Sequence, residues 1–181
     1  MNSCTKIVTM FNKNKLKIIE VFFEEPNKNF QLRQISRLTG IAVTSTKKYL
    51  QELLEERLLL KDSETLYPSY KANQENKLFK IYKQQYIIFK INCSGLIDYL
   101  EEKTLPRCIV LFGSMSKGEY NKKSDMDLFI QSLQQELDLK RFEKKLKHKI
   151  NVLFETNLKN LNKGLLNNIL NGIILSGHIR I

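Results

Sequence analysis

The sequence predicts an α+β protein with two folded parts and a helical connector, on three observations. Before residue 60, apolar side chains recur at helical spacing in three short segments. Residues 74–103 contain no proline and alternate charged with apolar residues at the same spacing. After residue 107, short runs of β-forming residues end in glycine or polar turns. We therefore expect domains at 1–73 and 105–181, joined by a helical connector at 74–104.

The charge of the chain favours a polyanionic partner. The 181 residues carry a net charge of +11, with 42% hydrophobic residues, which is enough for a core. Residues 1–90 hold 16 basic and 9 acidic residues (+7), and the remainder hold 14 and 10 (+4). Such a surface attracts phosphates through counterion release. The alternative is a lysine-rich composition that raises the charge without a binding role.

The sequence supports neither a membrane protein nor a zinc-binding protein. No apolar run approaches the roughly 20 residues that span a bilayer, and the N-terminus lacks the apolar segment of a signal peptide. The three cysteines do not have the paired spacing of zinc ligands. We therefore expect a cytoplasmic protein.

Two helices are predicted before residue 41. The segment 14–26, "NKLKIIEVFFEEP", has apolar positions at helical spacing, and Pro26 ends it. In the segment 29–40, "NFQLRQISRLTG", the apolar residues lie on one side as far as Leu38, and Gly40 is suited to the position after a helix.

A third helix and a hairpin follow. The segment 45–60, "STKKYLQELLEERLLL", opens at a cap-like Thr44 or Ser45 and has a buried stripe of Tyr and Leu. Its last leucines read as a strand, and a polar turn leads to a second strand in "LYPSYKA". Two short helices around a glycine turn follow the helix-turn-helix plan, and the hairpin adds a wing.

Residues 30–59 thus resemble a winged helix-turn-helix domain of bacterial and archaeal regulators. The resemblance implies that the start of the second helix of the motif enters the major groove of double-stranded DNA. It also implies a homodimer, because such regulators commonly read paired half-sites. The alternative is a module for protein–protein contact or dimerisation. The residues expected to face DNA are Thr44, Ser45, Lys47, Lys48 and Gln51, with Lys61 near the wing tip.

A possible phosphate cradle follows the first run of β-formers, residues 108–112. A strand that turns into a short helix at Gly113-Ser114 leaves backbone N–H groups free to bind phosphate oxygens. Gly113 allows a close backbone approach and Ser114 adds a hydroxyl. Lys117 can offer a cation, and Gly118 permits a tight bend.

Two carboxylates occupy the next predicted strand, "SDMDLFI". With a two-residue period, Asp125 and Asp127 point to one face, and Met126 and Leu128 point to the other. Neighbouring carboxylates repel each other unless a cation lies between them. Mg²⁺ is the expected cation, because it takes oxygen ligands and accompanies phosphates.

Gly113-Ser114, ten further residues, and then Asp125-x-Asp127 closely resemble the signature of the polymerase-beta-like nucleotidyltransferase superfamily, above all its small minimal members in bacteria and archaea. The resemblance implies that the acceptor hydroxyl attacks the α-phosphate of a nucleoside triphosphate and expels pyrophosphate. It implies catalytic and Mg²⁺-binding roles for Asp125 and Asp127. The implied nucleotide-binding residues are Gly113, Ser114, Lys117, Gly118 and Ser124.

The family usually supplies a third carboxylate from a later strand. In the predicted strand 150–155, "INVLFE", that position holds Asn151. Its carbonyl can ligate a metal weakly, but it carries no charge and cannot act as a base. Glu155 faces the same way but lies about 13 Å further along the strand, which makes it a poor substitute.

Two classes of function follow. An enzyme would transfer a nucleotidyl group, with ATP the expected donor, to a hydroxyl of a protein, a small molecule or a nucleic acid. Because the resemblance extends to toxin–antitoxin relatives, AMPylation of a partner protein is one version. A DNA-binding regulator or antitoxin-like protein would instead only sense nucleotide or a partner through its second domain. The intact Gly-Ser turn and aspartate pair favour the enzyme, which we expect. Asn151 and the basic helix favour the regulator.

Overall fold

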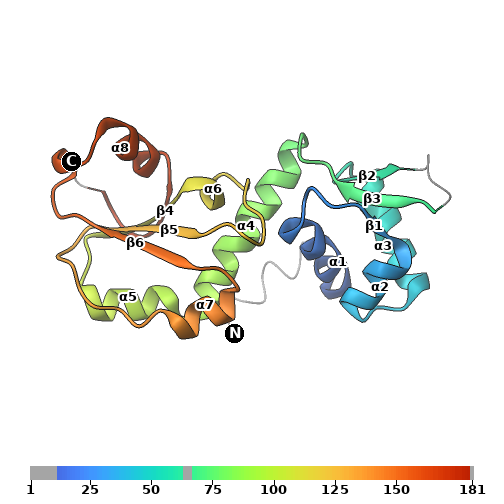
Figure 1. Ribbon diagram of the computed structural model, residues 1–181, viewed down its shortest axis with the longest axis horizontal. Coiled ribbons are helices and arrows are strands. Elements are labelled where there is room, and N and C mark those ends of the chain that lie inside the picture. The colour runs from blue at the N-terminus through green and yellow to red at the C-terminus, as the bar shows by residue number, and fades with distance from the viewer. Residues whose placement is uncertain (1–11, 63–66, 180–181) are drawn as a thin grey trace. The chain divides into compact units, whose positions relative to one another are not determined.

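The computed structural model describes residues 12–62 and 67–179 (Figure 1). The chain forms two compact units, which divide between Lys83 and Gln84 within the long helix α4 (Lys77–Ser94). Each unit contains one β-sheet. The predicted α+β class is therefore confirmed. None of the described helices is long and apolar enough to cross a membrane.

The first unit combines three helices with a small antiparallel sheet in the order β1-β3-β2. Its core is built from apolar side chains of all three helices, among them Phe22, Ile35 and Leu53, which are fully buried. The elements before α4 are α1 (Lys13–Glu24), β1 (Phe30–Gln31), α2 (Leu32–Thr39), α3 (Val43–Glu55), β2 (Leu59–Asp62) and β3 (Ser69–Ala72).

An ion-pair cluster lies at the edge of this core. Lys15 of α1 is largely buried, and its Nζ lies 3.3 Å from Glu52 Oε2 and 2.5 Å from Glu56 Oε1. Glu52 lies in the last turn of α3, and Glu56 is its C-cap residue. The cluster therefore joins α1 to α3 in addition to their apolar contacts.

Two details of the sequence prediction are wrong in this unit. The N-cap of α3 is Ala42 rather than Thr44 or Ser45. Thr44 and Ser45 therefore lie inside the first turn of the helix, and the Thr46 hydroxyl donates back to the carbonyls of Ile41 (3.2 Å) and Ala42 (3.0 Å). Leu38 is 60% exposed rather than part of the core, because α2 is short and only its central turn reaches the other helices.

The second unit contains a four-stranded mixed sheet in the order β6-β5-β4-β7, in which β5 and β6 are parallel and the other pairs antiparallel. The two predicted helices of the connector are confirmed, with the break at Gly95 (φ +80°). After α4 the elements are α5 (Leu96–Thr104), β4 (Cys108–Phe112), α6 (Gly113–Ser116), β5 (Met126–Ile130), α7 (Lys140–Leu146), β6 (Ile150–Phe154), a 3-10 turn (Leu158–Asn160), α8 (Lys163–Leu170) and β7 (Ile173–Gly177).

Both faces of this sheet are covered by helices (Figure 1). On one face, residues such as Leu111 and Leu128 pack against the apolar sides of α4, α5 and α7. On the other, Val110 and Phe129 pack against Ile169 of α8. Because side chains alternate along a strand, Asp127 lies on the same face as Phe129, near the start of β5.

Candidate active site

The Gly-Ser turn is shaped by its contact with Asp127. β4 ends at Phe112, and Gly113 has φ +73°, a left-handed conformation that side chains disfavour. A Cβ atom on Gly113 would lie 2.6 Å from Asp127 Oδ2, which is closer than such atoms approach. The backbone angle therefore favours glycine at this position, and any larger residue would also displace the Asp127 carboxylate.

The turn of α6 is held by hydrogen bonds from three directions. The Ser116 hydroxyl donates to the Gly113 carbonyl (2.8 Å), and the backbone N–H of Glu119 donates to the Ser114 carbonyl (2.9 Å). Gln84 of α4 donates from Nε2 to the Ser116 carbonyl (2.5 Å). Sequence reasoning did not find Gln84, because nothing in the local pattern of α4 points to a loop 32 residues away.

Ser114 and Lys117 remain open to a ligand. Ser114 is half-buried, and within the part of the chain that the structure describes its hydroxyl has no hydrogen-bond partner. The Lys117 side chain is exposed. Gly118 is buried at φ +68°, where the chain bends away from α6. The turn that adjoins Asp127 at Gly113 thus also carries a hydroxyl and a cation.

Asp127 occupies the central position of the site. In the sheet it pairs with Phe112 at the end of β4 on one side and with Asn151 of β6 on the other. Asp125 directly precedes β5 and is exposed, whereas Asp127 is half-buried. The sheet therefore brings the Gly-Ser turn, the aspartate pair and Asn151 together in one row.

Asn151 bridges the two carboxylates. Its Nδ2 lies 3.1 Å from Asp127 Oδ1 and 3.4 Å from Asp125 Oδ2. The amide donates a hydrogen bond to each carboxylate, which offsets their mutual repulsion. Asn151 thus lies beside the aspartate pair, where the sequence placed it.

Glu155 does not join this row. Its Oε1 accepts hydrogen bonds from the backbone N–H of Asn157 (2.9 Å) and from Asn160 Nδ2 (3.2 Å). The hydrogen bond from Asn157 is the main cause that lowers the pKa of Glu155. This carboxylate holds the turn that follows β6.

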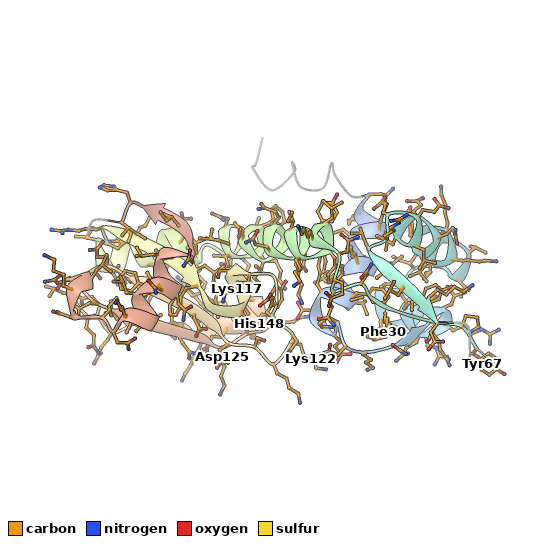
Figure 2. All side chains as sticks on the ribbon, turned by 90° about the horizontal axis from the view of Figure 1, so that it is seen from above. Phe30, Tyr67, Lys117, Lys122, Asp125 and His148 are labelled. Atoms are coloured by element: carbon orange, nitrogen blue, oxygen red, sulfur yellow. The ribbon has the colours of Figure 1, made fainter. Side chains whose placement is uncertain are left out.

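The loop before Asp125 is held by the corner between α7 and β6. His148 is 4% exposed, and its Nδ1 is 2.9 Å from the Ser124 carbonyl. Its ring packs edge-on against Tyr120, with 5.8 Å between the ring centroids. Ser124 Oγ accepts from the backbone N–H of Asn121 (3.0 Å), so the predicted nucleotide-binding hydroxyl is engaged within its own loop. Figure 2 shows His148 and Asp125 in the same region of this unit. Sequence reasoning did not find His148.

The donor atoms at the aspartate pair fit a hard cation. The two carboxylates supply oxygen ligands, the kind that Mg²⁺ prefers, whereas it is the amide nitrogen of Asn151 that faces the pair. Among residues 12–62 and 67–179, no group of three or more His, Cys, Asp or Glu side chains could hold a metal ion. A cation at this pair would therefore depend on water and phosphate oxygens for its other ligands.

The residues expected to bind DNA lie together in the first unit. Thr44, Lys47, Lys48 and Gln51 follow one face of α3, and all four are exposed. Gln51 donates to Glu55 within the same helix (3.1 Å). The other two are Ser45, which is half-exposed, and Lys61, which is exposed in β2 shortly before residues 63–66, which lie outside the described residues.

Residues 94–178 match the family model described as Polymerase beta, Nucleotidyltransferase. The match includes all four strands of the second sheet, the Gly-Ser turn and the aspartate pair. It supports a polymerase-beta-like domain in this part of the chain, with a nucleotidyltransferase-like function and a nucleotide substrate. No curated protein matches the chain.

Proposed function

We propose that this protein transfers a nucleoside monophosphate from a nucleoside triphosphate, ATP in the first instance, to an acceptor hydroxyl. The observation that carries the proposal is the contact between the Gly-Ser turn and Asp127. A Cβ atom on Gly113 would lie 2.6 Å from the Asp127 carboxylate, so a phosphate bound at the turn meets the carboxylate pair directly.

The nucleotide lies on the β4 side of the pair. There the Ser114 hydroxyl and the Lys117 ammonium bind phosphate oxygens, as a hydroxyl and a flexible cation do in other phosphate sites. Asp125 and Asp127 would hold Mg²⁺, and the bound ion would supply positive charge to the phosphate oxygens. Asn151 keeps the two carboxylates oriented through its amide.

The reaction forms one bond and breaks one. The acceptor oxygen bonds to the α-phosphorus, and the bond from that phosphorus to the oxygen bridging the β-phosphate breaks, which releases pyrophosphate. The hydroxyl proton passes to water, because Asn151 has no basic atom and cannot take it. A slow transfer is therefore expected relative to a site with three carboxylates.

The first unit is proposed to be a winged helix that binds double-stranded DNA. The order α1-β1-α2-α3-β2-β3, with a three-stranded sheet, supports this assignment. The exposed lysines of α3 support the DNA partner, because they lie where a recognition helix meets the major groove.

The decisive experiment is incubation with each α-labelled nucleoside triphosphate and Mg²⁺, alone and with cell extract. We expect label on an acceptor with the wild type and none with Asp125→Ala/Asp127→Ala. The control is Glu155→Gln, which changes a carboxylate outside the row and should transfer label normally. Transfer by the double aspartate variant at the wild-type rate would contradict the assignment.

A regulator is the second candidate function, and Asn151 is the observation that favours it. A site with two carboxylates and an amide can bind Mg-nucleotide without a base for catalysis. Nucleotide binding by calorimetry, together with no transfer of label to any acceptor, would favour a nucleotide sensor attached to a DNA-binding unit.

A further inference from the structure

The peptide groups on either side of Asp125 are both bound by the corner between α7 and β6. The carbonyl of Ser124 is 2.9 Å from Nδ1 of His148. The backbone N–H of Met126 donates to the Lys149 carbonyl (2.8 Å). Two consecutive residues of the corner, one through its side chain and one through its backbone, therefore hold the chain before and after this aspartate.

These two peptide groups determine where the Asp125 side chain points. A peptide group is planar, so the backbone at one residue has only two soft dihedral angles, which relate the plane before it to the plane after it. Restraining both planes restrains both angles and the direction of the Cα–Cβ bond. In this orientation Asp125 Oδ2 lies 3.4 Å from Asn151 Nδ2, which is also 3.1 Å from Asp127 Oδ1.

His148 supplies one of the two restraints from a buried position. A carbonyl oxygen only accepts hydrogen bonds, so Nδ1 of His148 carries the proton and donates it to Ser124. The ring is 4% exposed and packs edge-on against the fully buried Tyr120, with 5.8 Å between the ring centroids. A ring packed in this way keeps its donor atom in one position.

The corner adopts an uncommon backbone conformation beside His148. Lys147, the C-cap of α7, has φ +62°, in the left-handed region that residues other than glycine seldom adopt. Its N–H donates to the Glu143 carbonyl (2.7 Å), and the Glu143 carboxylate accepts from the Ile150 N–H (3.0 Å). Glu143 thus holds the chain on both sides of His148. Strained residues of this kind persist where surrounding contacts maintain them, and they are frequent at functional sites.

Resting on the proposed function, we propose that His148 is a positioning residue for the Mg²⁺ ligand Asp125. Its Nδ1–H holds the peptide group before Asp125, so that the carboxylate is oriented towards Asp127 before a cation binds. Without this donor the peptide group can rotate, and part of the binding free energy of the ion is then spent on ordering the loop. In this role His148 acts through Asp125 and does not itself bind the ion.

Two substitutions separate the hydrogen bond of His148 from its packing. His148→Phe retains a ring beside Tyr120 but has no donor. His148→Asn removes the ring, but its Nδ2 is as many bonds from the backbone as Nδ1 of histidine and can donate to the Ser124 carbonyl. The matched control is Gln131→Met, just beyond the other end of β5, where the 2% exposed Gln131 donates to the Thr156 carbonyl (3.2 Å).

Mn²⁺ alone is the probe, because it takes the same oxygen ligands as Mg²⁺ and its binding is measured by water-proton relaxation. Binding that Asp125→Ala/Asp127→Ala retains lies elsewhere and is subtracted. We expect His148→Phe to bind Mn²⁺ about tenfold more weakly than the wild type, as changes to residues that orient metal ligands commonly do. His148→Asn should bind Mn²⁺ more tightly than His148→Phe. Gln131→Met should lose stability to urea and keep the wild-type affinity for Mn²⁺.

A role in packing alone predicts the opposite order of the two variants, because phenylalanine preserves the ring and asparagine does not. Equal Mn²⁺ affinity of His148→Phe and the wild type would therefore overturn the proposal, and so would weaker binding by His148→Asn than by His148→Phe. If His148→Phe does not fold, His148→Gln replaces it, since its amide lies one bond further from the backbone. Equal Mn²⁺ affinity of the Asn and Gln variants would then overturn the proposal.

Transfer of label separates this proposal from the proposed function. Transfer by the wild type, together with unchanged Mn²⁺ affinity in His148→Phe, supports the proposed function and overturns the positioning role. If the wild type binds Mn²⁺ but no label moves to any acceptor, the proposed transfer is wrong, and the order of the His148 variants alone supports or overturns the positioning role. A wild type that binds no Mn²⁺, with or without ATP, overturns the positioning role whatever the label does.

Discussion

The Asn151 amide lies between two carboxylates, 3.1 Å from Asp127 Oδ1 and 3.4 Å from Asp125 Oδ2. It occupies the position opposite Asp127 in the parallel pair β5–β6. A neutral donor at this position stabilises the pair in the absence of a cation. The same donor lowers the negative charge available to attract one.

Replacing Asn151 by Asp should make the stability of the second unit depend on Mg²⁺. Without the ion, the variant loses the two hydrogen bonds from the Asn151 amide and gains repulsion among three carboxylates. We therefore expect the free energy of unfolding to fall by about 1 kcal/mol. Millimolar Mg²⁺ should restore it, because a ligand that binds only the folded state stabilises that state. Urea denaturation with and without Mg²⁺ measures both effects.

The control for that substitution is Asn151→Ala, which removes the hydrogen bonds without adding charge. Its stability should respond to Mg²⁺ no more than that of the wild type. An equal response of the Asp and Ala variants would show that a carboxylate at position 151 adds nothing to cation binding at the aspartate pair.

Gly113→Ala should cost more than the same change at Gly95. Both glycines have positive φ, +73° and +80°, so both substitutions carry a backbone penalty of about 1–2 kcal/mol. Gly95 has open space around the added Cβ, whereas at Gly113 the Cβ meets Asp127 Oδ2. Urea denaturation of the two variants measures the difference.

A double-mutant cycle assigns that difference to Asp127. In an Asp127→Ala background the two glycine substitutions should cost the same, because the carboxylate that Gly113→Ala meets is gone. If Gly113→Ala still lowered the stability more than Gly95→Ala in that background, a contact other than Asp127 would require the glycine.

Lys15→Met should destabilise the first unit at neutral pH by about 2 kcal/mol, since two charged hydrogen bonds to Glu56 and Glu52 are lost. Burial alone would lower the pKa of Lys15, but the hydrogen bonds and charges of Glu56 and Glu52 outweigh it and raise that pKa. The stabilisation is therefore full below the unfolded pKa of about 10.4 and is lost as pH rises through the higher folded value.

Denaturation of wild type and Lys15→Met from neutral to strongly alkaline pH checks the sign. The difference between them should shrink only at the alkaline end. Lys17→Met, at an exposed position of the same helix, is the control and should show no such dependence. A difference that stays constant at high pH would contradict the role of the ion pairs.

Lys47→Gln/Lys48→Gln should weaken binding to duplex DNA under the proposed function. The loss of two phosphate contacts should reduce the salt slope by about 1.8 and lower the affinity for different sequences alike. Electrophoretic shift assays over a range of salt concentrations measure this. Lys13→Gln/Lys17→Gln, on exposed positions of α1, should leave the slope unchanged. Equal slopes for the two variants would remove α3 as the DNA-binding helix.

The local spacing of apolar residues was sufficient to predict most helices and strands. It failed to predict where α3 begins and which apolar residues are buried. The shared face of Asp125 and Asp127 could be predicted, because side chains alternate between the two faces of any β-strand. The start of α3 could not, because its N-cap is Ala42, which has no side chain that could cap a helix and so gives no signal in the sequence. Leu38 has the right spacing for the core, but no element covers it.

By itself the sequence determined the helices and strands, the face of the aspartate pair and the polar residue at Asn151, because all of these depend on residues close along the chain. Only the tertiary structure decided which groups meet at the site. The contact of Gln84 with α6, the bond of His148 to the Ser124 carbonyl and the pairing of Asn151 with Asp127 join residues 24–32 positions apart. Such contacts depend on the order in which strands and helices pack, which no local period encodes.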